Sequence, residues 1–185
     1  MRLFNKINKK KYRKWGTGTE IYNPFVISGE EQIALGSNVK ILDNARISIY
    51  AKNEGAGDAL VQIDDGCYIG YNFSLLVKDK VHIEKNVLIA SNVLVTSENH
   101  GIDPESDLYY MEQPLEGKSV RIGEGTWIGE KACILPGVDI GKKCVIGAGS
   151  IVTRDIPDYC IAVGNPARII KRYNFETHCW EKECV

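Results

Sequence analysis

The feature that most constrains the fold is an apolar residue at every sixth position. In the second half of the chain this spacing is uninterrupted, through Ile122, Ile128, Ile134, Ile140, Ile146 and Val152. Shorter runs precede it, at Ile63, Ile69 and Leu75, at Ile83, Ile89 and Val95, and at Leu35, Ile41 and Ile47. A period of six fits neither the turn of an α-helix nor the alternation of an ordinary strand. It predicts a solenoid in which each hexad contributes one short strand and one corner.

A second inward position lies four residues after each apolar one and holds a small or medium side chain, as at Thr126, Ala132, Val138, Cys144 and Ser150. Three hexads would close a triangular coil of about 18 residues, so that residues one coil apart stack on one another. The pattern predicts an all-β fold, a parallel β-helix filled by columns of Ile, Leu and Val. A β-sandwich with chance spacing is the alternative, and six consecutive matches count against it.

The length of 185 residues suits one compact domain. We predict a basic N-terminal segment and cap over residues 1–32, a repeat domain over 33–164 and a helical C-terminal segment over 165–185. The period breaks between Val95 and Ile122, which predicts a loop extruded from the coil over about residues 96–121. A loop of that length in a compact domain usually carries function.

The overall charge is balanced, with 23 Lys and Arg against 24 Asp and Glu, which argues against a nucleic-acid partner. The first fifteen residues are strongly basic, with apolar residues interleaved. This mixture suits a peripheral contact with an anionic membrane, and also a solvated basic helix or a frayed arm. No apolar stretch approaches the roughly 20 residues of a membrane span, and no signal-peptide centre is recognisable. We therefore expect a cytoplasmic protein, with the inner face of the membrane open as a contact.

The six cysteines show no metal-binding spacing. Cys67, Cys133 and Cys144 recur at or beside the small inward positions, where a reduced thiol fills space. No CxxC motif or Cys/His cluster is present, so the prediction includes no metal.

Three segments carry a resemblance to a known family. They are Val120–Gly129 (VRIGEGTWIG), Gly147–Pro157 (GAGSIVTRDIP) and Gly164–Arg168 (GNPAR). The chain resembles the hexapeptide-repeat acyltransferases over roughly residues 60–172, and it is most similar to galactoside, maltose and polysaccharide-biosynthesis O-acetyltransferases. The resemblance implies a left-handed β-helix, a homotrimer with active sites in the clefts between subunits, and acetyl-CoA as co-substrate. It also implies a sugar or glycan acceptor, lipid-linked glycans included.

The extruded loop contains the candidate catalytic residue, His100. In the family a loop at this place supplies the catalytic histidine, and an imidazole suits a base that takes the proton of an attacking hydroxyl. A solvent-exposed histidine without a catalytic role is the alternative. His82 is predicted to lie on the outer surface of a strand and His178 to be incidental. The histidine pair, five residues apart, of β-helical zinc carbonic anhydrases is absent from this sequence.

The remaining site residues follow from the resemblance. It implies that Asn72 and Trp127 bind the acceptor, although Asn72 could instead serve a tight corner and Trp127 could be buried against a neighbouring subunit. The residues matched to the CoA groove and to the CoA phosphates and adenine are Ala148, Thr153, Arg154, Arg168 and Lys171. The cations among them could each be ordinary surface residues.

The combined prediction is an acetyl-CoA-dependent O-acetyltransferase that acts directly on a sugar or glycan hydroxyl with His100 as general base. Two alternatives stay open. One is a xenobiotic or serine-type acetyltransferase, with a different acceptor and the same mechanism. The other is a non-catalytic β-helical scaffold that binds partners through its flat faces.

Overall fold

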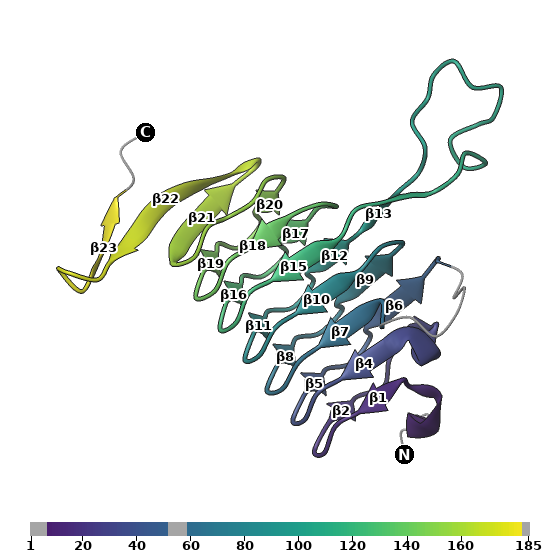
Figure 1. Ribbon diagram of the computed structural model, residues 1–185, viewed down its shortest axis with the longest axis horizontal. Coiled ribbons are helices and arrows are strands. Elements are labelled where there is room, and N and C mark those ends of the chain that lie inside the picture. Colours follow the sequence, from purple (N-terminus) through teal and green to yellow (C-terminus); the bar gives the residue numbers. More distant parts are fainter. Residues whose placement is uncertain (1–6, 52–58, 183–185) are drawn as a thin grey trace.

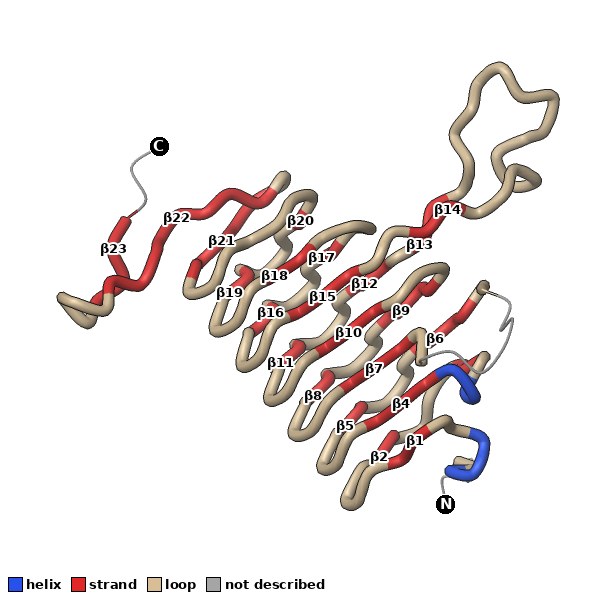
Figure 2. The backbone as a smooth tube through the Cα atoms, viewed as in Figure 1, coloured by secondary structure: helices blue, strands red, loops and turns tan. Residues whose placement is uncertain are grey.

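The chain winds as a stack of triangular coils whose sides are three sheets. The computed structural model describes residues 7–51 and 59–182, and it consists almost entirely of short strands joined by turns (Figures 1 and 2). Successive strands fall in turn on the three sheets, which we name A, B and C. The described ends of the chain lie at opposite ends of the stack (Figure 1).

All pairs inside the coil are parallel, as expected when each coil repeats the path of the one before. Sheet A contains β1 (Lys14–Trp15), β4 (Ile33–Leu35), β7 (Val61–Ile63), β10 (Val81–Ile83), β15 (Val120–Ile122) and β18 (Asp139–Ile140). Sheet B contains β2 (Glu20–Ile21), β5 (Lys40–Ile41), β8 (Tyr68–Ile69), β11 (Leu88–Ile89), β16 (Trp127–Ile128), β19 (Val145–Ile146), β21 (Cys160–Gly164), β22 (Ala167–Asn174) and β23 (Cys179–Lys182). Sheet C contains β3 (Val26–Ser28), β6 (Arg46–Ile49), β9 (Ser74–Val77), β12 (Leu94–Thr96), β17 (Cys133–Ile134) and β20 (Ile151–Val152).

The core is the one that the six-residue period predicts. The uninterrupted run from Ile122 to Val152 is fully buried at every sixth position, with 0 % of each side chain exposed. The second inward positions are buried as well, and Thr126 satisfies its hydroxyl by donating to the carbonyl of Gly141 at 2.8 Å. Stacked coils therefore share one continuous apolar interior, as solenoids do.

The coil length changes along the stack. Arg121 pairs with Asp139, 18 residues away, whereas Asn72 and Asn92 face each other 20 residues apart. The longer coils absorb the two extra residues that interrupt the period after Leu75. Several corners hold asparagine at positive φ, including Asn44, Asn72 and Asn92, a conformation that asparagine adopts more readily than most residues.

The coil begins earlier than the predicted boundary at residue 33. β1, β2 and β3 pair with β4, β5 and β6 and form a first coil. That coil carries the same apolar period, because Trp15, Ile21 and Ile27 are six residues apart and stack on Leu35, Ile41 and Ile47. The predicted segment before Ile7 lies outside the described residues.

The helical prediction for the C-terminal segment is wrong. Its described residues form β22 and β23, which extend sheet B as an antiparallel hairpin beyond the coil (Figure 1). Ile169, Ile170 and Tyr173 favour strand, and β22 covers the edge that β21 would otherwise leave open. Among the described residues the helices are two 3₁₀ turns, η1 (Lys9–Lys11) and η2 (Glu30–Gln32).

Within the described residues, the chain leaves the coil between β12 and β15. Residues 97–119 project from the prism on a two-stranded antiparallel stem of β13 (Glu98–Asn99) and β14 (Glu116–Gly117) (Figure 1). Thr96, Val120 and Arg121 belong to coil strands, so this loop is slightly shorter than the predicted 96–121.

Over the described residues, no helix has the length and apolar character needed to cross a bilayer.

Candidate active site

His100 sits just beyond the stem of the loop with one ring nitrogen fixed. Its Nδ1 lies 3.0 Å from the backbone carbonyl of Tyr110 across the loop. A carbonyl oxygen can only accept, so Nδ1 carries the hydrogen and the neutral ring keeps its lone pair on Nε2. The side chain is exposed. This is the tautomer that a general base requires, with the free nitrogen turned away from the contact that orients the ring.

The loop is held in shape by a buried amide. Gln113 is 6 % exposed and its Nε2 donates to the carbonyls of Asp103 at 2.9 Å and Leu108 at 3.1 Å, while its Oε1 accepts from the backbone N–H of Asp103 at 3.0 Å. Gly101 packs against it, because a Cβ there would lie 2.8 Å from Cβ of Gln113. These contacts tie the two sides of the loop together next to His100.

The base of the loop is anchored to the coil. Ser97 is fully buried; its hydroxyl donates to the carbonyl of Asp79 at 2.6 Å and accepts the backbone N–H groups of Lys78 and Asp79. The backbone N–H of Lys118 returns to the carbonyl of Ser97 at 3.0 Å. The loop therefore leaves and re-enters the coil at a fixed point.

The tip of the loop is apolar and uncovered in the isolated chain. Four of its side chains are at least 60 % exposed: Ile102, Tyr109, Tyr110 and Met111. An exposed apolar cluster of this kind marks a surface that another molecule covers.

Asn72 occupies a corner between β8 and β9 at φ 56°. Its side chain belongs to a ladder of amides that follows this corner: Asn44 Nδ2 donates to Asn72 Oδ1 at 3.2 Å, and Asn72 Nδ2 donates to Asn92 Oδ1 at 3.0 Å. Asn92 in turn donates to Glu130 at 2.8 Å. The geometry fits the corner role, and it leaves one amide hydrogen of Asn72 for an acceptor.

Trp127 points outward from sheet B and is 50 % exposed. Its neighbours in the same outward row are Leu88 on one side and Val145 on the other, followed by Ile161 and Lys171. We call the residues Trp127, Val145, Ile161 and Lys171 the sheet B row. It changes from aromatic to aliphatic to cationic along the stack.

The other predicted CoA residues lie around the same end of the stack. Ala148 is in the turn between β19 and β20, beside the β21–β22 turn, where the N–H of Gly164 donates to Ser150 Oγ at 3.1 Å. Arg168 lies on β22, opposite Val163. Thr153 and Arg154 follow β20 and are exposed at the corner between sheets C and A, because Ile156, two residues further on, bridges to Ile140 of β18.

One chain does not bring these groups together. Asn72 lies at the corner between sheets B and C, and Trp127 lies on the face of sheet B. The loop with His100 runs from β12 on sheet C to β15 on sheet A, which is a different corner of the triangle. In one chain, these three residues therefore lie on different parts of the prism.

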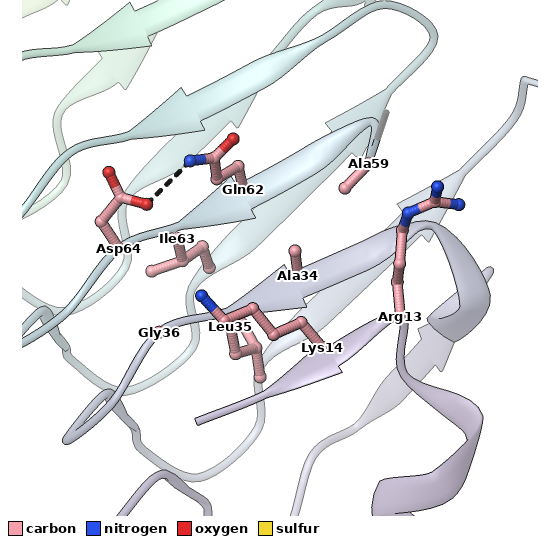
Figure 3. Close-up of a pocket in the computed structure, with 9 residues that line it drawn as sticks. All are labelled: Arg13, Lys14, Ala34, Leu35, Gly36, Ala59, Gln62, Ile63 and Asp64. Carbon is pink, nitrogen blue, oxygen red and sulfur yellow. Dashed lines mark hydrogen bonds between the residues drawn. The ribbon is translucent and has the colours of Figure 1, made fainter. Parts of the chain in front are cut away.

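The open hollows of the single chain agree with this reading. A cavity of about 490 Å³ opens on sheet A, with Arg13 and Lys14 on one side and Gln62 and Asp64 on the other (Figure 3). It holds none of the predicted site residues. A smaller hollow of about 140 Å³ lies inside the loop, lined by Asp103, Leu108 and Tyr110 among others.

The side chains of His82 and of the buried cysteines have structural roles. His82 Nε2 lies 2.9 Å from Asp64 Oδ2 on the outer face of sheet A, so this histidine is a surface residue as predicted. Cys67 is buried, and burial raises the pKa of its thiol from 9.0 to about 11. Cys67, Cys133, Cys144, Cys160 and Cys179 all have free thiols. Within residues 7–51 and 59–182, no group of three or more His, Cys, Asp or Glu side chains is placed to hold a metal.

Sequence reasoning missed Gln113, the carbonyl of Tyr110 and the continuation of the sheet B row. Gln113 and Tyr110 lie in the loop, where no period marks a position as buried. The row becomes visible once the hexad positions are placed on one sheet face.

Comparison with known proteins places the chain in a family. Residues 119–154 match the model of the bacterial transferase hexapeptide (six repeats). WbbJ of Escherichia coli K12, described as a lipopolysaccharide-biosynthesis O-acetyl transferase, is 35 % identical over 167 residues, which cover 86 % of this chain and 81 % of that protein. The chain belongs to the hexapeptide-repeat acetyltransferases. As a member of that family it is an acyltransferase, and the resemblance that the sequence predicts is confirmed.

Two further proteins match over less of their length or at lower identity. The galactoside O-acetyltransferase of Escherichia coli K12 is 38 % identical over 62 % of this chain, and the match spans about half of that protein, 55 %. An N-acyltransferase from Bacillus cereus, solved with dTDP and 3-hydroxybutyryl-CoA, has a TM-score of 0.75 at 24 % identity and covers 96 % of this chain and 93 % of its own. At that identity the likeness shows the fold.

Proposed function

We propose that the protein transfers an acetyl group from acetyl-CoA directly to a hydroxyl of a sugar or glycan, with His100 as general base. The observation that carries the proposal is the contact between His100 Nδ1 and the carbonyl of Tyr110 at 3.0 Å, which leaves Nε2 free to accept a proton. The family supplies the reaction class, and the E. coli relative acts in lipopolysaccharide biosynthesis according to its description.

The chemistry follows from these parts. Nε2 removes the proton of the acceptor hydroxyl as the oxygen attacks the thioester carbonyl, and the Nδ1–H contact with Tyr110 stabilises the imidazolium that forms. The tetrahedral intermediate collapses with cleavage of the carbon–sulfur bond. The CoA thiolate leaves and takes the proton from His100, so the base returns to its starting state. Backbone N–H groups at the cleft would serve the oxyanion.

The donor would lie along the outer face near the C-terminal end of the stack. The sheet B row offers apolar surface to the pantetheine arm and a cation, Lys171, to the phosphates. Ala148, with its small side chain, and Arg168 lie at the neighbouring corner. Acyl-CoA is the ligand of the Bacillus cereus N-acyltransferase that shares the fold.

A homotrimer would complete the site. His100 and Trp127 lie on different sides of one prism, and the loop tip exposes Tyr109, Tyr110 and Met111. A neighbouring prism would cover that tip and supply the opposite wall of the cleft. Trp127 and the free amide hydrogen of Asn72 would then bind the acceptor beside His100.

The N-terminal end of the stack would lie against the membrane that carries a lipid-linked acceptor. Lys9, Lys10 and Lys11 are exposed there, and Phe25 is 78 % exposed beside Lys11 in a hollow of about 440 Å³. Basic and apolar groups together favour an anionic lipid surface. Sedimentation with vesicles rich in phosphatidylglycerol, but not with neutral vesicles, is expected. Equal recovery with both would contradict this contact.

The decisive experiment measures thiol release from acetyl-CoA with a panel of free sugars, aryl glycosides and nucleotide sugars. The wild type should release CoA with at least one of them, and His100→Ala should lower kcat by about 10²- to 10⁴-fold, the usual worth of general base catalysis. The matched control is His82→Ala, which removes a histidine from the outer face of sheet A. A fully active His100→Ala enzyme would disprove the proposal.

Further measurements distinguish the two alternative functions from the proposed one and test whether the site is shared between subunits. L-serine and hydroxylated antibiotics in the same assay test a serine-type or xenobiotic acceptor. A wild-type protein that does not bind CoA at millimolar concentration would be a scaffold.

Co-expression of two inactive variants, His100→Ala and Trp127→Ala, should restore activity, because mixed trimers contain clefts with both native residues. Failure to restore any activity would contradict a shared site.

A further inference from the structure

The C-terminal hairpin places two lysines directly opposite each other. Lys171 on β22 pairs with Lys182 on β23, and the next pair on the same face of the hairpin is Tyr173 with Trp180. Directly opposed residues of an antiparallel pair project from the same face, and like charges in that position repel. In the part of the chain that the structure describes, neither lysine has an ion-pair partner. The two cations therefore share one face of the hairpin without a paired carboxylate among the described residues.

Other contacts fix the hairpin in this register. The rings of Tyr173 and Trp180 pack edge to face with centroids 5.3 Å apart, and Phe175 packs against both Tyr173 and Tyr159. On the opposite face, Glu181 accepts from Asn174 Nδ2 at 3.0 Å and from Thr177 Oγ1 at 2.9 Å. Glu181 is thereby turned away from the lysine face. These contacts hold the two strands in the register that sets Lys171 opposite Lys182.

The lysine pair lies in line with the proposed donor groove. Lys171 is the last residue of the sheet B row, and Lys182 extends the row by one strand. At the usual spacing of strands, Lys171 is about 14 Å and Lys182 about 19 Å from the position of Trp127. An extended pantetheine arm spans such a distance. Val145 and Ile161 lie between and offer it an apolar surface.

We propose that Lys182 and Lys171 form a two-lysine clamp for a phosphate group of CoA, an inference that rests on the proposed function. Lys182 is then a donor-specificity residue of this enzyme. A phosphate between the two ammonium groups relieves their repulsion and gains two charge-assisted hydrogen bonds. The group bound is either the 3′-phosphate of the ribose or the pyrophosphate.

The test measures CoA binding by calorimetry with the full chain, so it needs no acceptor. Lys182→Gln should weaken CoA binding by about tenfold, the usual worth of a hydrogen bond to a charged group. The matched control is Lys40→Gln, which removes a lysine from the outward row of the same sheet at its other end and should bind CoA as the wild type does. Dephospho-CoA, which lacks the 3′-phosphate, identifies the phosphate group that is bound. The wild type and Lys182→Gln should bind dephospho-CoA with equal affinity if the 3′-phosphate is the group bound, and with different affinities if it is the pyrophosphate.

Thermal unfolding without ligand separates binding from a structural role. Because one of two opposed like charges is removed, the Tm of Lys182→Gln without ligand should equal or exceed that of the wild type. CoA should raise the Tm of Lys182→Gln by less than it raises the Tm of the wild type. Wild-type CoA affinity in Lys182→Gln, or a lowered Tm in the absence of CoA, would overturn the clamp while the proposed function stands. A wild type that does not bind CoA would remove both.

Discussion

The coil and the loop that leaves it are built on opposite principles. In the coil, a side chain such as Ile128 is buried because every sixth position points inward, and its neighbours above and below are residues of the same kind. In the loop of residues 97–119, Gln113 is buried because its amide bonds to the backbone of Asp103 and Leu108 across the loop. The comparison teaches that repetition builds the core of this protein, while an irregular insertion supplies its candidate base.

The largest effect should follow from a change in the middle of the coil. Ile128→Ala removes three carbons from a fully buried column and should lower the free energy of unfolding by about 3 to 4 kcal/mol, measured by urea denaturation at fixed protein concentration. Lys85→Ala, at an exposed corner, is the control and should change it by less than about 0.5 kcal/mol. Equal losses of unfolding free energy in Ile128→Ala and Lys85→Ala would show that the buried column does not stabilise the coil.

A change in the loop should lower kcat and leave the stability of the coil nearly unchanged. Gln113→Ala removes the amide that ties the loop together and should lower kcat by about 10- to 100-fold through misplacement of His100. The unfolding of the coil should shift little, because Gln113 lies outside its core. Glu105→Ala, an exposed change in the same loop, serves as control. A Gln113→Ala enzyme that loses stability and keeps its kcat would reverse the comparison.

The coil should also respond to pH through its buried thiols. Because burial raises the pKa of Cys67 to about 11 from an ordinary value of 9.0, the thiol stabilises the fold fully below pH 9 and loses this contribution as pH rises toward 11. The wild type should lose about 2 kcal/mol more than Cys67→Val over that interval. Valine is the matched replacement, since Val39 and Val87 occupy the same place in adjacent coils. Denaturation curves at pH 8 and 10.5 check this, and identical losses in both proteins would contradict it.

The smallest effect concerns a corner where the regular coil meets the site. Asn72→Ala should cost about 1 kcal/mol, because alanine disfavours the positive φ of that corner, whereas Asn72→Gly should cost a few tenths. Both variants remove the amide, so both should raise KM for the acceptor if Asn72 binds it. An unchanged KM in Asn72→Gly would assign the residue to the corner alone.

Prediction from sequence succeeded where neighbours repeat and failed where they do not. The inward columns, the break after Val95 and the outward place of His82 all follow from the period. The first coil at β1 to β3 was left out of the predicted repeat domain although Trp15, Ile21 and Ile27 continue the period, because three positions preceded by a basic segment form only a short run. The C-terminal strands were mistaken for a helix because β22 forms to cover an edge of β21, which no local pattern reveals.

The sequence by itself determined the solenoid, since a six-residue period of apolar side chains can be buried in one stacked triangular coil and in few other ways. It also placed His100 in the loop that interrupts this period after Val95, and the family resemblance made that histidine the candidate base. The tertiary structure decided what surrounds these groups: the carbonyl that fixes the tautomer of His100, the amide ladder of Asn72, and the row that runs from Trp127 to Lys182. Such contacts join residues far apart in the chain, and their partners are set by the folding of the loop and the register of the strands.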